Sequence, residues 1–197
     1  MNMEATMEAL KQRIVREGRI LPGNIVKVDG FLNHRVDAQF LGELADEIAR
    51  QFDLTGVTKV LTAEASGIPL ATVCAYKYGV PMVFAKKAKS DNIEGGLYKS
   101  EIFSYTYKKK VTLICAREWL DEKDRVLIVD DFMANGAAMR GLIDIVKMSG
   151  AQLAGIACAI EKGFQHGGDQ LRAEGYPLKS LAIIESADEN GFRFRED

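Results

Sequence analysis

The sequence predicts an α/β protein with a central, mostly parallel sheet flanked by helices. Short apolar runs typical of buried strands alternate with segments of helical periodicity through the middle of the chain. The clearest strand is the run at 126–129, and a helix is indicated after it because Met139, Leu142, Ile143 and Val146 recur at helical spacing. Strands that alternate with helices favour a parallel sheet covered on both faces.

The other elements follow from the same patterns, taken in chain order. In the first half we expect a helix over 7–16, a short strand at 25–28, a helix beginning at Asp37, a strand over 57–61 and a helix over 68–78. In the second half we expect strands at 82–85, 111–115, 153–160 and 180–184, a hairpin within 90–110, a short helix at 169–174 and a final hairpin reaching Phe194. Residues 1–6 are expected to be mobile.

The length and pattern predict one domain over 1–197. Its core is expected at about 37–160, and the two chain ends, 7–36 and 161–197, are expected to form a small hood over the carboxyl edge of the sheet. Apolar residues make up 47% of the 197 residues, which is enough for a packed core.

Composition also excludes several classes of protein. The net charge of −2 argues against a nucleic-acid-binding surface, and no apolar run reaches the length of a membrane span. No signal-peptide pattern opens the chain. The three cysteines, each in an apolar context, are expected to be buried free thiols in a reducing cytoplasm.

The strand at 126–129 leads into a candidate phosphate site. Asp130 and Asp131 end the strand, and a turn of small residues at 134–138 precedes the helix. Such a turn directs backbone N–H groups toward one point at the positive end of a helix dipole, which suits a phosphate. The carboxylates beside it can hold hydroxyls, so a ribose phosphate is the expected ligand.

Three alternatives apply to this stretch. A dinucleotide fingerprint requires three glycines where only Gly136 is present, and the chain lacks a Walker loop. A purely structural strand-to-helix turn, with the two acids solvated at the strand end, is the remaining alternative. Two adjacent acids before a turn of small residues favour the phosphate site over that alternative.

The stretch 126–138 resembles the phosphoribosyl-diphosphate signature of type I phosphoribosyltransferases. Further blocks spread the resemblance over nearly the whole chain, and within the family they are most similar to the bacterial members that use xanthine. These blocks are MEALKQRI (7–14), KVDGFLNH (27–34), FAKKAKS (84–90) and GIACAIEKGFQ (155–165). The resemblance implies the type I phosphoribosyltransferase fold with its hood.

The resemblance also implies roles for the sugar-phosphate side of the site. Asp130 and Asp131 would be the catalytic acids that contact the ribose hydroxyls. The diphosphate would lie at the turn holding Ser66 and Gly67, where the family often has a cis peptide. Basic residues beside it match Lys86, with Lys87 as a further candidate. The loop binding the 5′-phosphate would consist of Ala134, Asn135, Gly136, Ala137 and Ala138.

The base side and the mobile loop follow in the same way. A purine would stack on Phe132, and Lys162 matches the lysine that reaches its 6-oxo group and N7. Val26 and Asn33 match hood positions around the base, and the Asn33 amide is a candidate donor to the 2-oxo group of xanthine. Ser104 and Tyr105 resemble a dipeptide in the flexible loop that closes over the reacting centre.

The activity implied is transfer of ribose 5-phosphate from 5-phosphoribosyl 1-diphosphate to a purine, with Mg²⁺ bound mostly through the substrate. Xanthine is the expected base, in purine salvage, and guanine or hypoxanthine is the alternative. Ala134 stands where the wider 6-oxopurine family has an acid near N7, so Asp131, Lys162 or a substrate anion would manage that proton. The family implies a homodimer. A purine-sensing regulator of the same fold is a further alternative, but the chain lacks a basic DNA-binding segment.

Overall fold

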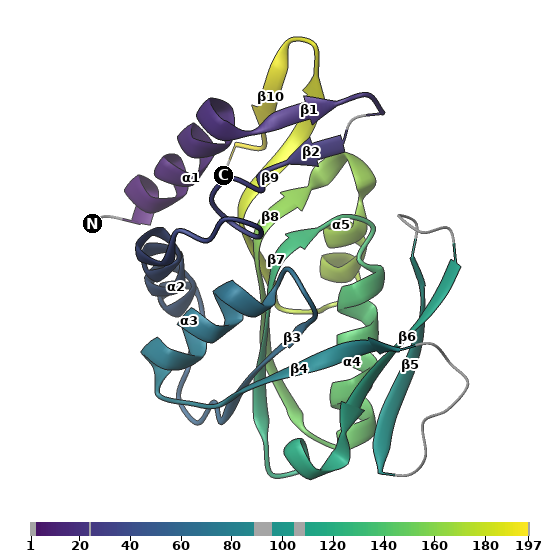
Figure 1. Cartoon of the computed structure of the whole chain (residues 1–197). Helices are drawn as coiled ribbons and strands as arrows, with labels where there is room; N and C mark the ends of the chain where they lie inside the picture. Colours follow the sequence, from purple (N-terminus) through teal and green to yellow (C-terminus); the bar gives the residue numbers. More distant parts are fainter. Residues whose placement is uncertain (1–2, 24, 89–95, 105–108, 197) are drawn as a thin grey trace.

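The computed structural model describes residues 3–23, 25–88, 96–104 and 109–196. Eight strands form one sheet in the order β10-β9-β8-β7-β3-β4-β6-β5, shown in Figure 1. The strands are β3 (Lys59–Ala63), β4 (Met82–Ala88), β5 (Leu97–Ser104), β6 (Lys109–Ala116), β7 (Arg125–Met133), β8 (Gln152–Lys162), β9 (Leu178–Asp188) and β10 (Gly191–Phe194). Neighbours from β9 to β4 are parallel, and β10, β6 and β5 attach by antiparallel pairing. The mostly parallel sheet is therefore confirmed.

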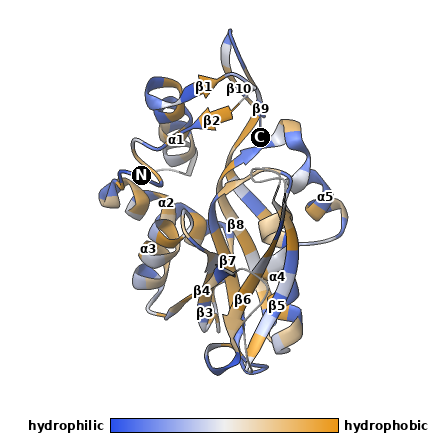
Figure 2. Ribbon diagram, turned by 45° about the vertical axis from the view of Figure 1, so that its right-hand side comes forward, coloured by the Kyte–Doolittle hydropathy of each residue, from blue (hydrophilic) through white to orange (hydrophobic). Residues whose placement is uncertain are grey.

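Helices cover both faces of the sheet. α2 (Ala38–Gln51) and α3 (Ile68–Tyr78) pack on one face, while α4 (Ala137–Ser149) and α5 (Gly167–Ala173) pack on the other (Figure 1). The strands between them are almost continuously apolar, as Figure 2 shows. Parallel strands buried on both faces are expected to have this composition. Asp37 caps α2 by accepting the Phe40 N–H at 3.2 Å, which confirms the predicted start of that helix.

The N-terminal segment forms a small layer above the sheet. It consists of α1 (Met3–Glu17) and the antiparallel strands β1 (Arg19–Leu21) and β2 (Ile25–Lys27). α1 packs against α2 and against β9 and β10, so the two chain ends lie side by side (Figure 1). The helix is longer than predicted. The expectation of mobility is wrong for residues 3–6, because they form the start of α1 and the Thr6 side chain is buried.

A segment at 28–37 then returns from β2 to α2. Arg13 of α1 anchors it, since its guanidinium lies 4.8 Å from the Phe31 ring centroid and 4.6 Å from that of Phe40. The same guanidinium pairs with Asp37 at 2.8 Å. These contacts fix the segment that carries Asn33 relative to the sheet. β9 belongs to the main sheet, so the division of the chain into core and hood stays a prediction.

Two 3₁₀ turns complete the chain, η1 (Arg117–Trp119) and η2 (Gly163–Gln165). The hairpin predicted within 90–110 is wrong in its bounds, because β5 pairs with β6, which contains the strand predicted separately at 111–115. None of the helices in the described ranges is long and apolar enough to cross a membrane.

Candidate active site

The acid pair lies at the carboxyl end of β7, between the sheet and the N-terminal layer. Asp130 and Asp131 are 6% and 1% exposed. The Asp131 backbone N–H donates to Oδ1 of Asp130 at 3.0 Å, and the Asn33 amide donates to Oδ2 of Asp131 at 2.7 Å. The structure thus joins Asn33, a residue of the segment between β2 and α2, to the acid pair across 98 positions of the chain.

The pair lies in an unfavourable electrostatic environment. Burial, together with the neighbouring charge of Asp131, raises the pKa of Asp130 well above its usual range. Lys87 partly offsets this rise. Burial and the same two carboxylates raise the pKa of the Cys158 thiol, which lies on the adjacent strand β8. Two buried acids with few donors form a site suited to a ligand that brings hydroxyls or positive charge.

The predicted phosphate loop follows β7 and opens α4. Gly136 takes a left-handed conformation with φ of 80°, which brings the chain round into the helix. The Asn135 side chain accepts the Ala137 N–H at 3.0 Å. No acidic side chain occupies the first turn of α4, so the positive end of that helix is free to attract an anion.

Gly167 supports this loop from behind, which sequence reasoning did not identify. A Cβ on Gly167 would lie 2.4 Å from the Ala134 carbonyl oxygen and 2.5 Å from the Gly136 nitrogen. Only a glycine permits this close approach of the α5 backbone to the loop. The pair Gly167-Gly168 after β8 was the available signal in the sequence.

The turn after β3 approaches the acid pair from the other side. It contains the cis peptide that the resemblance led us to expect, between Glu64 and Ala65. A Cβ on Gly67 would lie 2.4 Å from Oδ1 of Asp130 and 2.2 Å from Oγ1 of Thr62. Gly67 therefore lies against the acid pair, with the Ser66 side chain exposed beside it, and their role in binding the diphosphate stays a prediction.

Thr62 is the residue in this cluster that sequence reasoning missed. Its hydroxyl is fully buried, and among the described side chains it is the one buried polar group without a hydrogen-bond partner. Buried hydroxyls are normally paired, because an unpaired one costs desolvation free energy. The strand pattern shows only that Thr62 ends an apolar run.

Phe132 and Lys162 come together at the ends of β7 and β8. The Lys162 amine lies 5.1 Å from the Phe132 ring centroid, a cation–π distance. Burial lowers the pKa of this amine from its usual value. Val26 is 7% exposed in the hydrophobic cluster against which Phe132 packs. Lys162 and Phe132 are thus in contact and Asn33 reaches Asp131, while the assignment of all four residues to the base stays a prediction.

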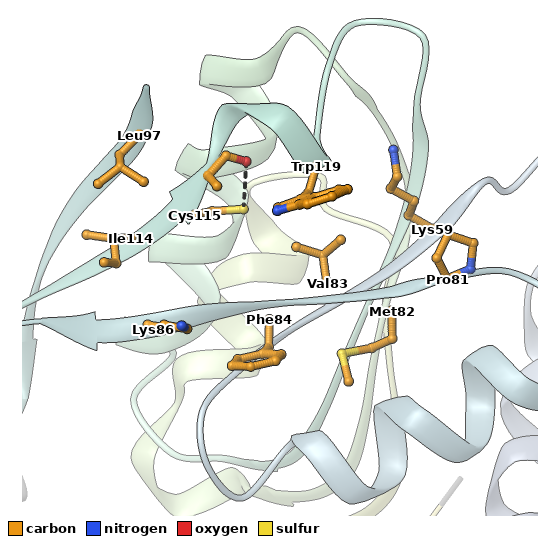
Figure 3. A pocket seen from close by; sticks show the side chains of 11 residues that line it. Lys59, Pro81, Met82, Val83, Phe84, Lys86, Leu97, Ile114, Cys115 and Trp119 are labelled. Atoms are coloured by element: carbon orange, nitrogen blue, oxygen red, sulfur yellow. Dashed lines mark hydrogen bonds between the residues drawn. The ribbon is translucent and has the colours of Figure 1, made fainter. Parts of the chain in front are cut away.

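Lys86 lies apart from this group. Its amine lies 5.9 Å from the Phe84 ring and lines a hollow of about 600 Å³ between β4, β6 and η1, shown in Figure 3. Lys87, on the opposite face of the strand, is the lysine that acts on Asp130, and its N–H donates to Glu64 at 2.7 Å. The role of Lys86 stays a prediction. So does that of Ser104 and Tyr105, because Ser104 is the last residue of β5 and Tyr105 falls outside the described residues.

Comparisons with known proteins identify the family of the chain. A family model described as phosphoribosyl transferase domain matches residues 29–196, which include every predicted site residue except Val26. The chain belongs to this family. The match covers the acid pair, the phosphate loop and the turn at Gly67 together.

Curated relatives extend the match to nearly the whole chain. A xanthine phosphoribosyltransferase of Ruminiclostridium cellulolyticum is 47% identical over 190 residues, covering 96% of this chain and 100% of the relative. Another, from Bifidobacterium adolescentis, is 49% identical and covers 94% and 97%. Among solved structures, an adenine phosphoribosyltransferase from Rhodothermus marinus has a TM-score of 0.72 at 22% identity, with 91% and 99% covered. That last likeness shows the fold alone.

Proposed function

We propose that this chain is a xanthine phosphoribosyltransferase. It would transfer ribose 5-phosphate from 5-phosphoribosyl 1-diphosphate to xanthine, forming xanthosine 5′-monophosphate and diphosphate in purine salvage. The observation that carries the proposal is the near-full-length identity, 44–49%, to curated relatives of that name. The contacts of Asp131 with Asn33 and of Lys162 with Phe132 support it further.

The sugar phosphate would lie along the ends of β7 and β3. The 5′-phosphate would accept hydrogen bonds from the N–H groups of the loop at 134–138, and the diphosphate would lie at Ser66 and Gly67. Asp130 and Asp131 would hold the ribose hydroxyls and stabilise the positive charge that develops on the sugar as the diphosphate leaves. The two carboxylates are buried, so their interaction with that charge would be only weakly screened.

The base would stack on Phe132, with the Lys162 amine donating to its 6-oxo group. The low-polarity surroundings that lower the pKa of Lys162 also strengthen such a hydrogen bond. The Asn33 side chain has two N–H groups, and the bond to Asp131 uses one of them. The second would meet the 2-oxo group of xanthine, whereas guanine would present a donor there and leave both groups unsatisfied.

Mg²⁺ is part of this proposal, bound with the diphosphate substrate. No three acidic, histidine or cysteine side chains within the described ranges form a metal cluster. The hard carboxylate oxygens of Asp130 and Asp131 fit a cation that is held mainly by substrate oxygens and water. When bound, Mg²⁺ would neutralise charge on the leaving diphosphate.

A cytoplasmic homodimer is also proposed. All three cysteines are free, which suits a reducing compartment. The hollow in Figure 3 is lined mostly by apolar side chains, of which Phe84 is 36% and Trp119 56% exposed. An apolar surface of this kind fits a second copy of the chain. Sedimentation equilibrium of the purified chain tests the dimer.

The test of the activity is to measure initial rates with 5-phosphoribosyl 1-diphosphate and Mg²⁺, offering xanthine, guanine and hypoxanthine separately. We expect the highest kcat/KM with xanthine. Asn33→Ala should reduce that preference, while Lys179→Met, on an exposed lysine of β9, should leave all three rates unchanged.

The possible outcomes separate the alternatives. A preference for guanine or hypoxanthine would leave the phosphoribosyl transfer in place and overturn the assignment of the base. Tight binding of 5-phosphoribosyl 1-diphosphate without turnover of any purine would overturn the enzymatic proposal and favour a purine-sensing regulator.

A further inference from the structure

A fully buried carboxylate lies beneath the proposed site without taking part in it. Glu161, near the end of β8, is 0% exposed. Both of its oxygens are held by the Arg172 guanidinium, with Nη1 donating to Oε1 at 3.2 Å and Nη2 donating to Oε2. The Ser180 hydroxyl also donates to Oε2, at 2.5 Å. The charge is therefore fully paired, inside the sheet layer that faces α5.

Glu161 lies between residues of both substrate subsites. It directly precedes Lys162, and since successive strand side chains alternate in direction, the two point to opposite faces of the sheet. In the register of β7 and β8 it is also the partner of Met133, which directly precedes the phosphate loop. A shift of Glu161 would therefore move the base-side lysine and the first residue of the loop together.

The backbone of α5 is pressed against both features. A Cβ on Gly168 would lie 2.1 Å from Oε1 of Glu161. The neighbouring Gly167 makes the equally close approach to Ala134 and Gly136 described above. Arg172, one turn further along α5, pulls this helix onto Glu161 and thereby holds Gly167 against the loop.

The chain end extends the same network to the surface. Asp169 pairs with Arg172 at 3.2 Å and with Arg195 at 2.7 Å, and Arg195 also bonds Glu185 of β9. These pairs lie on partly exposed side chains, so each contributes little alone. Together they attach the segment after β10 to α5.

We propose that Glu161 and Arg172 form a positioning pair that sets the phosphate loop and Lys162 at one fixed spacing, so that sugar phosphate and base meet in register. The inference rests on the proposed function and assigns to it two residues that touch neither substrate. Reacting groups must be held close to their productive geometry, and small displacements produced by distant residues reduce rates strongly.

A role in stability alone accounts poorly for this pair. Taking two charges out of water costs free energy that their attraction often only just returns, so a buried ion pair is weak support for stability. Replacing a buried ion pair by well-packed apolar residues of similar volume is often neutral, so the fold itself does not require the two charges. A pair kept for positioning should therefore be replaceable without loss of stability but with loss of activity.

The test uses the double variant Glu161→Gln with Arg172→Met, which removes both charges and nearly keeps their volume. We expect KM for xanthine and for 5-phosphoribosyl 1-diphosphate each to rise roughly tenfold, with a thermal midpoint close to that of the unaltered chain. Equilibrium binding of 5-phosphoribosyl 1-diphosphate alone should weaken by a similar factor, because the phosphate loop loses its support.

A second ion pair, which joins α4 to the end of α5, offers a matched control. Arg140 of α4 and Glu174 at the end of α5 form a two-pronged pair at 2.6 and 2.7 Å, and both side chains are exposed. The double variant Arg140→Met with Glu174→Gln removes an equivalent pair from the other end of α5. Its kinetic constants should remain those of the unaltered chain.

Two results would overturn the inference. One is unchanged kinetic constants and binding in the Glu161/Arg172 variant, and the other is a fall in thermal midpoint with normal constants for the protein that remains folded. Absence of turnover by the unaltered chain with any purine would instead contradict the proposed function, and the binding comparison between the variants would still test the positioning role.

Discussion

The two ends of β7 carry buried carboxylates in opposite circumstances. Before the strand, Asp124 is 7% exposed and is held by the Lys59 amine at 2.6 and 2.8 Å, the Thr58 hydroxyl at 2.8 Å and the Asp121 N–H at 3.0 Å. In the carboxyl-terminal half of the strand, Asp130 is 6% exposed, and the interactions that act on it include one backbone N–H and the repulsion of Asp131.

The difference appears in the pKa of each acid. Hydrogen bonds and the charge of Lys59 hold the pKa of Asp124 below its usual value despite burial, whereas burial and Asp131 raise that of Asp130. At similar burial, the well-paired Asp124 therefore stabilises the fold in its charged form, whereas the charged form of Asp130 costs stability. Asp130, the acid with fewer partners, lies toward the carboxyl end of β7, and parallel α/β sheets bind their ligands at the carboxyl ends of their strands.

The largest effect should come from exchanging each acid for its amide. We expect Asp130→Asn to lower kcat/KM roughly 100-fold, because a developing charge loses its carboxylate, while the thermal midpoint rises. Asp124→Asn should leave the rates nearly unchanged and lower the free energy of unfolding by about 1 to 3 kcal/mol, because the Lys59 amine loses its partner. Initial rates and thermal unfolding measure both.

The pH dependence of unfolding sharpens this contrast. The pKa of Asp130 is raised in the folded state. Its contribution to the free energy of unfolding is therefore present below the pKa of the unfolded chain and is lost as the pH rises through the pKa of the folded state. Asp124 has a lowered pKa, so its contribution is present above the unfolded pKa and is lost as the pH falls through the folded value. The gain from Asp130→Asn should therefore appear toward neutral pH, and the penalty of Asp124→Asn should fade in acid. Equal signs for both variants at pH 7 would break the comparison.

A second prediction concerns the close approach of Gly67 to Asp130 and Thr62. Gly67→Ala places a methyl group 2.4 Å from Asp130 and 2.2 Å from Thr62, so the turn must move. We expect kcat/KM to fall at least roughly tenfold and stability to fall by about 1 to 3 kcal/mol. Gly42→Ala in α2 is the control, since its Cβ would meet only Lys77 at 3.7 Å and should add about 0.5 to 1 kcal/mol of stability. Unchanged kinetics in Gly67→Ala would show that the turn does not need this contact.

The smallest effect concerns two threonines at opposite ends of the central strand β3, Thr58 just before it and Thr62 near its carboxyl end. The Thr58 hydroxyl donates to Asp124 at 2.8 Å and accepts the Arg125 N–H at 3.1 Å, so Thr58→Val should cost about 1 kcal/mol. The Thr62 hydroxyl has no hydrogen-bond partner among the described residues, so Thr62→Val should leave stability unchanged or raise it by about 1 kcal/mol. Chemical denaturation compares the two variants, and equal losses would show that Thr62 is paired in solution.

Much of the local structure could be predicted because its causes are local. The helix predicted at 68–78 matches α3, and Asp37 caps α2 as predicted. Both helices could be predicted because helical periodicity, and for α2 the polar cap, involve only neighbouring residues. β1 was not predicted, because it has only two apolar residues, whereas β2 was indicated by three nearby β-branched residues, Ile25, Val26 and Val28. The acid pair, Gly67 and the loop at 134–138 could be proposed as site residues because they lie in contiguous motifs, and their roles stay predictions.

The remaining features of the site depend on contacts between distant residues. The sequence alone indicated a parallel α/β sheet with two acids and an anion-binding turn at its carboxyl edge, because strand and helix periods and turn chemistry act over a few residues. Only the tertiary structure decided that Asn33 reaches Asp131, that Lys87 rather than Lys86 acts on Asp130, and that Arg172 pairs with Glu161. The physical reason is that burial and electrostatic pairing depend on which strands and helices become neighbours in space.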